Sequence, residues 1–420
     1  MVLKARKITG RLSILITGAL LLPPFLSYAN APQPEKGCQA DEIHWTINGP
    51  QSISFDWRGE ASEIRYGITN ASGLSARGSD PSPMPFSSPR PFRQVLLKSR
   101  KPGTTYHYAI GNCGGHTFHT PPAPGTSGFV VDVEGDIGAS TNYSDVVPDQ
   151  RLVASHMPAL VLVLGDLTYG NPNGQAAVDR HFNDMMVWSQ DTAYMPSWGN
   201  HEWDVPKFDD LRNYKGRFKL PHAQASPGAP AAGGHGQDWS WFDYGNARFI
   251  AYPEPYSSAT WPAWYKKAKR IMDQAQADPN ITFIATFGHR PPYTSGYHKS
   301  SMVLRRELLN LAEHHSKYVL NVNGHNHDYE RSYPQHGLVS VTAGIGGSEL
   351  EESHTACLFR KCPKPTWSAF RAMHFGILRL SFTNSRIEGS FLCGPAGGGK
   401  NDVQCESGSV IDHFTIEAKK

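Results

Sequence analysis

The sequence lacks several features that mark common classes of protein. Its six cysteines show no CxxC spacing, which excludes a zinc ribbon, and no apolar run reaches the roughly 20 residues of a membrane-spanning helix. We find no internal repeat, coiled coil or long low-complexity tract. No motif marks an activated Ser, Cys or Asp nucleophile, so no covalent enzyme intermediate is expected.

The chain also lacks a large excess of charge of either sign. Its formal net charge is +3, from 40 Lys and Arg against 37 Asp and Glu. Four of the cations lie in an expected N-terminal leader, so the remainder of the chain is close to neutral. A near-neutral protein gives no case for binding nucleic acid or an anionic membrane surface, and we expect neither partner.

The N-terminus has the pattern of a secretory signal peptide. Four cations precede a short apolar run, residues 12–22, which ends at two prolines. We therefore expect a signal peptide over residues 1–29, cleaved after Ala29, and a secreted or periplasmic protein. A retained membrane anchor is the alternative.

The even number of cysteines supports export, because all six lie beyond this leader and suit disulfides in an oxidising compartment. Six cysteines allow many pairings, so the connectivity stays open. Order along the chain favours the pairs Cys38–Cys113, Cys357–Cys362 and Cys393–Cys405.

Residues 38–120 are expected to form a small β-sandwich. In segments such as SISFDW, EIRYGI and TTYHYAIG, apolar residues alternate with polar ones, which is typical of strands with one buried face. About 80 residues of such short strands favour a fibronectin type III-like arrangement. No cluster of residues here looks catalytic. Residues 121–128, rich in proline and glycine, read as a linker.

Residues 129–420 are expected to form an α/β catalytic domain. The runs FVVDVEGD, ALVLVLGD, ARFIAY, ITFIATFGH and YVLNVNGH are apolar and β-branched, as in strands buried on both faces. Between them, residues 261–278 and 300–315 carry apolar side chains at helical spacing. The C-terminal part of the chain reads as a β-hairpin and a closing strand.

Polar side chains gather where the buried strands end. They are Asp136 in GDIG, Asp166 and Tyr169 in GDLTY, Asn200, His201 and Glu202 in GNHE, His289 in GHR, and His325 and His327 in GHNH. Strand carboxyl ends are where α/β sheets bind ligands, and the preceding glycines allow a sharp turn. One such motif alone most often marks a turn or packing, but five in one domain indicate a site.

The residue types in these motifs point to metal ions. Carboxylates clustered without a cation would repel each other at a high cost in free energy. Oxygen donors mixed with imidazoles suit iron, zinc or manganese, and thiolates are absent from the motifs. Two aspartates, an amide, three histidines and a tyrosine exceed the needs of one tetrahedral zinc and suit two ions that share a carboxylate. Paired ions are a standard device for hydrolysing phosphate esters.

The ordered motifs resemble those of the calcineurin-like metallophosphoesterases. The tyrosine of GDLTY and the ending GHNHDYER are similar to the purple acid phosphatases, whose larger members carry an N-terminal fibronectin-like domain. The resemblance implies a two-domain α+β/α/β fold. An N-terminal fibronectin III-like β-sandwich would precede a four-layer α/β/β/α metallophosphoesterase sandwich.

The resemblance also implies which residues hold two ions. Ligands of the first ion, Fe(III), would be Asp136, Tyr169 and His327. Ligands of the second ion, Fe(II), Zn or Mn, would be Asn200, His289 and His325, with Asp166 as the bridging carboxylate. The motif of His289 departs from the family pattern VxxH, because Thr286 stands at its first position.

Two further histidines are implied as catalytic residues. His201 would stabilise negative charge on the phosphate, and His298 would donate a proton to the leaving alcohol. Tyr297 stands where some family members have a second histidine. Glu202 would orient a ligand or His201. In GHNHDYER we expect Glu330 and Arg331 to form an ion pair that supports the histidine loop.

These expectations define an exported dinuclear metal-dependent acid phosphatase. It would hydrolyse small phosphate monoesters by attack of a metal-bound hydroxide, which Fe(III) makes available at low pH. A metallophosphodiesterase on the same scaffold is the enzymatic alternative. A secreted binding or adhesion module that has lost its chemistry is the alternative outside enzymes. The physiological substrate, the second metal and the oligomeric state stay open.

Overall fold

The structure, a computed structural model, describes most of the chain beyond the leader. Two predictions, the signal peptide over residues 1–29 and the pair Cys357–Cys362, lie outside the described residues. The described residues belong to one compact unit. Their ranges are 37–71, 73–86, 90–139, 143–203, 211–230, 234–351, 363–398 and 404–419.

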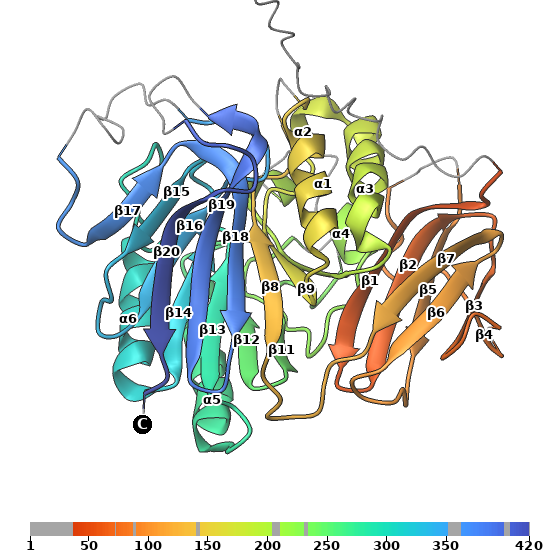
Figure 1. Ribbon diagram of the computed structural model, residues 1–420, viewed down its shortest axis with the longest axis horizontal. Coiled ribbons are helices and arrows are strands. Elements are labelled where there is room, and N and C mark those ends of the chain that lie inside the picture. Colours follow the sequence, from red (N-terminus) through yellow and green to blue (C-terminus); the bar gives the residue numbers. More distant parts are fainter. Residues whose placement is uncertain are drawn as a thin grey trace, which may run out of the picture. The chain divides into compact units, whose positions relative to one another are not determined.

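The N-terminal part is sheet-rich, with two antiparallel sheets that pack face to face (Figure 1). The strand orders are β1-β2-β5 and β4-β3-β6-β7. The ring of Phe55 lies 4.8 Å from the ring of Tyr108, because the apolar positions of the alternating segments meet between the sheets. The strands are β1 (Ala40–Gly49), β2 (Ser52–Gly59), β3 (Glu63–Gly67), β4 (Leu74–Arg77), β5 (Phe92–Leu97), β6 (Thr105–Ile110) and β7 (Cys113–His119).

The outer face of the sheet β1-β2-β5 is buried as well, which alternation alone did not predict. Ser54 and Asp56 on β2 are as inaccessible as their apolar neighbours. Helix α3 (Gln175–Ser189) lies against β1, where the hydroxyl of Ser189 donates a hydrogen bond to the carbonyl of Ile43 at 2.9 Å. The polar side of this sheet is therefore an internal contact with the α/β part.

Two larger sheets form the α/β part. The first has the strand order β10-β9-β8-β18-β19-β20, and the second has the order β11-β12-β13-β14-β16-β15-β17. Strands β8, β9 and β10 are parallel, as are β12, β13, β14 and β16. The first sheet consists of β8 (Phe129–Glu134), β9 (Leu160–Leu164), β10 (Ala193–Ser197), β18 (His374–Phe382), β19 (Arg386–Gly398) and β20 (Val410–Glu417). The second consists of β11 (Trp241–Tyr244), β12 (Ala247–Ala251), β13 (Phe283–Gly288), β14 (Tyr318–Asn323), β15 (Tyr329–Ser332), β16 (Val339–Ala343) and β17 (Ser368–Ala372).

Helices cover the outer faces of these two sheets (Figure 1). Helices α1 (Val146–His156) and α3 pack on the first sheet, and α5 (Thr260–Ala277) and α6 (Met302–His314) pack on the second. The predicted apolar stripes of α5 and α6 are buried. Between the sheets, the rings of Phe249 and Phe382 are 5.5 Å apart. The prediction of a mixed α/β fold with a sheet-rich N-terminal region is thus confirmed.

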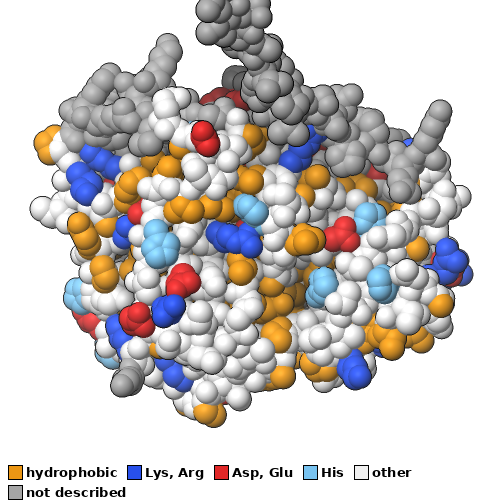
Figure 2. All heavy atoms as spheres, viewed as in Figure 1, with side chains coloured by type: hydrophobic (Ala, Val, Ile, Leu, Met, Phe, Trp, Pro, Cys, Tyr) orange, Lys and Arg blue, Asp and Glu red, His pale blue; other side chains and the backbone are white. Residues whose placement is uncertain are grey.

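Three short helical segments lie in the loops that follow β9 and β10. They are α2 (Gly170–Asn173), the 3₁₀ turn η1 (Asn200–Glu202) and α4 (Arg212–Lys215). None of the helices in the described part of the chain has the length and apolar character needed to cross a bilayer. Figure 2 shows acidic, basic and histidine side chains interspersed over the visible face.

Two disulfides are present among the described residues, and they are two of the pairs that the order of the cysteines favours. Cys38 bonds to Cys113, with 5.2 Å between the Cα atoms, and so joins the start of β1 to β7. Cys393 on β19 bonds to Cys405, with 6.3 Å between the Cα atoms.

Candidate metal centre

The carboxyl ends of strands from both large sheets meet at one cavity of about 590 Å³. The loops after β8, β9 and β10 come from the first sheet, and those after β13 and β14 come from the second. The residues that line the cavity are Asp166, Tyr169, Asn200, His201, Tyr297, His298, His325, His327, Glu349, Leu350 and Glu351. Asp136 and His289 lie just beneath this lining and contact its members.

Asp136, Tyr169 and His327 form the first group of potential ligands. The Tyr169 hydroxyl lies 2.9 Å from Nε2 of His327 and 3.5 Å from Oδ1 of Asp136. Nε2 of His327 is 3.4 Å from the same carboxylate oxygen. The three donor atoms face one another, so one ion placed between them could take all three.

Asp166, Asn200, His289 and His325 form the second group. Nε2 of His289 lies 3.0 Å from Oδ2 of Asp166 and 3.1 Å from Oδ1 of Asn200. One ligand atom each of Asp166, His289 and His325 lies within 4.8 Å of the others. The structure therefore brings together all seven predicted ligands, as two neighbouring groups.

The backbone holds several of these residues in an unusual conformation. The φ angles of Asp136, Asp166, Tyr169 and His325 are 57°, 49°, 49° and 72°, in the left-handed region that few non-glycine residues adopt. Such strain persists only where the surrounding structure imposes it, and it is concentrated at functional sites. The glycines of the motifs let neighbouring groups come close to the backbone. A β-carbon at Gly199, for example, would clash with the carboxylate of Asp166.

Two histidines are oriented by backbone carbonyls. Nδ1 of His289 lies 2.9 Å from the carbonyl oxygen of Leu164, and Nδ1 of His327 lies 2.6 Å from that of Glu349. A carbonyl only accepts, so each Nδ1 carries a proton and donates it. Nε2 of each ring is thus the atom presented to the ligand group, as in many metal sites.

In this site the negative charges of two carboxylates interact with several imidazoles and shift the pKa values of both kinds of group. Burial lowers the pKa of His289, but the carboxylates of Asp166 and Asp136 outweigh burial and raise it to about 10. Burial likewise lowers the pKa of His327, and its contact with Asp136 raises it to about 9. Burial raises the pKa of Asp166, but the charges of His289 and His201 hold it below its ordinary value.

The donor set fits metal cations. The negative charges of Asp136 and Asp166 are balanced here by protons on His289 and His327, and bound cations would supply the same positive charge. Burial and the neighbouring positive groups lower the pKa of His325 well below its ordinary value. His325 is therefore neutral, and the lone pair of its Nε2 accepts a hydrogen bond from Arg290, which an ion bound through this atom would replace.

His201 and Glu202 lie on the 3₁₀ turn after β10 and have different surroundings. Nδ1 of His201 is 2.7 Å from the side-chain oxygen of Asn171, and its ring packs on Tyr169 with centroids 4.1 Å apart. Glu202 is fully buried and accepts hydrogen bonds from the backbone N–H groups of Asp166, Leu167 and Gly199 at 2.6–2.9 Å. Glu202 thus holds the loop that carries Asp166.

His298 also lines the cavity, beside a carboxylate that sequence reasoning missed. Its ring stacks on that of His325, with centroids 4.0 Å apart and planes 19° apart. Nε2 of His298 is 3.3 Å from Oε1 of Glu351. Glu351 follows a glycine-rich segment after β16, which ends beside β14. The end of β16 was therefore the feature of the sequence that could have indicated Glu351.

The predicted ion pair between Glu330 and Arg331 is wrong. Arg331 instead binds Asp412 on β20, with Nε 2.7 Å from Oδ2. Glu330 accepts hydrogen bonds from the backbone N–H and the hydroxyl of Ser295 at 2.6 and 2.8 Å. Both side chains support the histidine loop, but each has its own partner.

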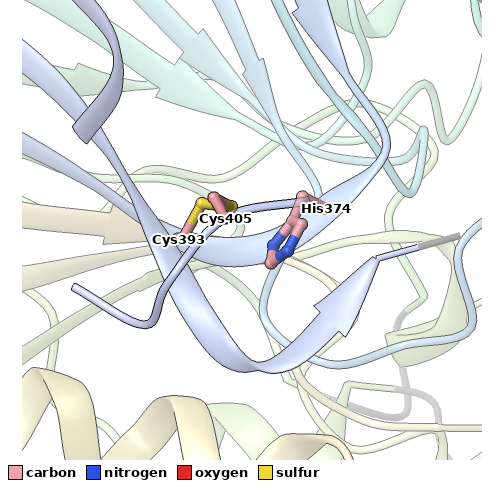
Figure 3. A group of neighbouring side chains, drawn as sticks. All are labelled: His374, Cys393 and Cys405. Carbon is pink, nitrogen blue, oxygen red and sulfur yellow. A yellow bond between two sulfur atoms is a disulfide. The ribbon is translucent and has the colours of Figure 1, made fainter. Parts of the chain in front are cut away.

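A second group of residues with metal-ligand spacing carries no metal site. Figure 3 shows His374 next to Cys393 and Cys405, whose ligand atoms lie within 4.8 Å of one another. The two sulfur atoms are joined in a disulfide and cannot act as thiolate ligands. We therefore assign this group a structural role.

Comparison with known families gives two matches. The family "Calcineurin-like phosphoesterase" matches residues 129–329, and "Iron/zinc purple acid phosphatase-like protein C" matches residues 337–391. Purple acid phosphatase 15 of Arabidopsis thaliana is 25% identical over 64% of this chain, and the match spans 56% of that protein. The probable inactive purple acid phosphatase 27 of the same plant is 24% identical, over 96% of this chain and 73% of its own length.

Solved structures show the same fold. Purple acid phosphatase PPD1 from yellow lupin (Lupinus luteus) seeds superimposes with a TM-score of 0.67 at 19% identity, over 90% of this chain and 74% of that one. The two family matches, over residues 129–329 and 337–391, identify the chain as a calcineurin-like metallophosphoesterase. Within that class it is of the purple acid phosphatase-like type and has the C-terminal domain of those proteins. The iron/zinc family that matches the C-terminal part agrees with a centre that holds two metal ions.

Proposed function

We propose that this chain is an exported acid phosphatase that hydrolyses small phosphate monoesters with two metal ions. The observation that supports this most strongly is the division of seven donors, five of them buried, into two adjacent groups beside one cavity. In this proposal Asp136, Tyr169 and His327 hold Fe(III). Asn200, His289 and His325 hold Fe(II), Zn or Mn, and Asp166 bridges the two ions.

Bound ions of this kind clamp phosphoryl oxygens and make a water acidic enough to react at low pH. Two imidazoles of the chain act beside them. His201 faces the cavity with Nε2 and stabilises the negative charge of the phosphate, while Asn171 fixes its other ring nitrogen. His298, which also lines the cavity, gives a proton to the departing alcohol.

The domain organisation is part of the proposal. A fibronectin III-like domain over residues 38–120, a linker over 121–128 and a catalytic domain over 129–420 agree with a three-stranded sheet packed on a four-stranded one, followed by the two larger sheets. Export after removal of residues 1–29 agrees with the two disulfides, which form in oxidising compartments.

Turnover of two substrates by the purified chain, loaded with iron and zinc, tests the proposal. We expect two metal ions per chain and hydrolysis of p-nitrophenyl phosphate at least tenfold faster than that of bis-p-nitrophenyl phosphate. Asp166→Asn should lose about 10³-fold or more in kcat, since it removes the shared ligand. The matched control is Asp243→Asn, which changes a partly exposed carboxylate paired with Arg248 and should keep its activity.

Each other outcome assigns a different function. Faster hydrolysis of the diester would identify a phosphodiesterase on the same scaffold. No turnover of either substrate with two ions bound would reject the enzyme and place the chain with the inactive relatives. Removal of the ions with a chelator should abolish turnover, and their return should restore it.

A further inference from the structure

We propose that Glu351 is a positioning residue for the acid that protonates the leaving group, and that it acts by holding the imidazole of His298. This inference rests on the proposed phosphatase function and assigns a role to a residue outside the sequence motifs. It concerns the part of the cavity that His298 and Glu351 line.

Three contacts fix His298, and each restricts a different motion. Its backbone N–H donates a hydrogen bond to Oδ1 of Asn326 at 2.7 Å, which sets the position of the chain. Its ring stacks on the ring of His325, which sets the plane of the imidazole. Stacking still permits a half-turn flip of the ring about its Cβ–Cγ bond, which keeps the plane and exchanges the positions of ring nitrogens and carbons. The 3.3 Å contact between Nε2 and Oε1 of Glu351 is the one that selects the direction of each ring nitrogen.

Glu351 is itself anchored to the candidate metal centre. Its Oε2 lies 3.4 Å from the backbone nitrogen of His327, which donates to it. Its side chain is 18% exposed, so water competes only weakly for the carboxylate. One oxygen of Glu351 therefore holds the loop of a candidate ligand, while the other reaches His298. This arrangement couples the position of the acid to the position of the ions.

The chemistry that this pair supports is protonation of the leaving oxygen. During hydrolysis the oxygen of the attacking water forms its bond to phosphorus, and the bond from phosphorus to the alcohol oxygen breaks. That oxygen takes the proton of the His298 imidazolium, and His298 afterwards takes a proton from solvent water. A carboxylate hydrogen-bonded to one ring nitrogen fixes the orientation of the imidazole, as in other carboxylate–histidine pairs.

The need for this proton depends on the alcohol. p-Nitrophenolate is a stable anion and leaves phosphorus with little help, whereas an alkoxide such as that of glycerol leaves only when protonated. Loss of a positioned acid therefore slows alkyl esters more than activated aryl esters. A purely structural defect would slow both substrates alike. The ratio of the two rates is thus a specific readout of the role of Glu351.

The experiment compares kcat for glycerol 2-phosphate and p-nitrophenyl phosphate in the metal-loaded full chain. For E351Q we expect about a 30- to 100-fold loss on glycerol 2-phosphate and less than about a threefold loss on p-nitrophenyl phosphate, since general-acid catalysis is typically worth 10²–10⁴-fold. H298Q should show the same pattern. Adding E351Q to H298Q should cost less than about twofold more, because the two residues act as one unit.

An exposed carboxylate outside the cavity supplies the control. Glu313 on α6 pairs with His336, and E313Q removes the same charge away from the cavity lining, so the ratio of the two rates should equal that of the wild type. Metal content and melting temperature of each variant are measured alongside.

Three results would overturn the proposal. The first is an equal loss on both substrates, or no loss, in E351Q. The second is an effect of E351Q that persists in full in the H298Q background, because Glu351 would then act without His298. The third is a wild type that hydrolyses neither substrate, which rejects the phosphatase function itself and this inference with it.

Discussion

At the scale of single residues, Tyr169 tests the first candidate ion most directly. Its ring is buried, and its hydroxyl lies between His327 and Asp136. A phenolate bound to Fe(III) absorbs visible light by charge transfer. We therefore predict that the iron-loaded wild type is coloured and that Tyr169→Phe loses this band while it stays folded, at a cost of about 1 kcal/mol for the hydroxyl.

The measurement is a visible spectrum together with the iron content of each protein. Tyr194→Phe is the matched control, because Tyr194 is equally buried but its hydroxyl contacts His181 in the layer outside the sheet. It should keep the band. A colourless wild type with iron bound would show that Tyr169 is a packing residue.

A second prediction at this scale concerns Asp149 on α1 and the effect of pH. Asp149 is fully buried, and neither carboxylate oxygen finds a hydrogen-bond partner among the described residues. Burial, with the negative charges of Glu134 and Asp145, raises its pKa well above the ordinary value. The folded state therefore holds this proton more tightly than the unfolded chain does, and stability falls as the pH rises above about 4.

Asp149→Asn removes this ionisation. At pH 7 the variant should be more stable than the wild type by about 1 kcal/mol or more, and the difference should shrink at pH 5. Urea unfolding at the two pH values measures it. Asp80→Asn, at an exposed surface pair, should change stability by less than about 1 kcal/mol at both. If the difference in stability between Asp149→Asn and the wild type were the same at both pH values, ionisation of Asp149 would not be its cause.

At the scale of elements, the turn after β10 controls the loop after β9. Glu202 accepts three backbone hydrogen bonds, two of them from Asp166 and Leu167. Oε2 of Glu202 accepts from both Asp166 and Gly199, and Oε1 accepts from Leu167, so Glu202→Gln, which replaces one acceptor by a donor, leaves at least one of the three N–H groups facing another donor. We predict a loss of about 10- to 100-fold in metal affinity, the usual effect of removing a group that orients a ligand.

Competition with a chelator, followed by metal analysis, measures this affinity. Glu307→Gln on α6 is the matched control, because Glu307 is buried but contacts Arg306 on the outside of the second sheet. Its metal affinity should equal that of the wild type. Equal affinities in both variants would mean that Glu202 only supports the fold.

At the scale of the whole molecule, a buried ionic network joins the N-terminal sheets to the α/β part. Nε of Arg217 lies 2.8 Å from Oε2 of Glu42 on β1, and its other end reaches Asp179 on α3 at 3.3 Å. Arg58 on β2 contacts the same Asp179 at 2.6 Å. Arg217 and Glu42 are 1% exposed at the side chain, so neither charge can turn to water. The two parts are therefore held together rigidly.

Arg217→Met should destabilise the protein by about 3–5 kcal/mol, because it removes the nearer of the two cations that contact buried Glu42 and leaves only Arg58, at 3.2 Å. Arg386→Met, which breaks an exposed pair with Glu388, should cost less than about 1 kcal/mol. Urea unfolding compares the two. A loss below about 1 kcal/mol in Arg217→Met would show that Arg58 alone balances the charge of Glu42.

The sequence predicted those features that depend on local pattern. Apolar runs ending in a glycine and a polar residue marked the strands, and their ends located Asp136, Asp166 and His289. It missed Glu351, because the end of β16 belongs to the site only once β16 is known to lie beside β14. Alternation also read Asp56 as solvent-facing, since a pattern does not distinguish water from a polar surface of the same protein.

The error at Glu330 has a geometric cause. Neighbours on a strand point to opposite faces of the sheet, so Glu330 and Arg331 on β15 cannot meet. Their partners, Ser295 and Asp412, are distant in the sequence. Adjacent opposite charges indicate an ion pair only where the backbone turns them to one side.

The convergence of strand ends from both large sheets has a consequence for assembly. Each candidate ion would take ligands from both large sheets. For the first ion, Asp136 follows β8 of the first sheet and His327 follows β14 of the second. Metal binding is then thermodynamically coupled to the packing of one sheet on the other. A chain whose sheets are misaligned would hold ions weakly, so occupancy of the centre would report correct assembly. Hydrogen exchange should accordingly slow on metal loading in β8 and in β14 together.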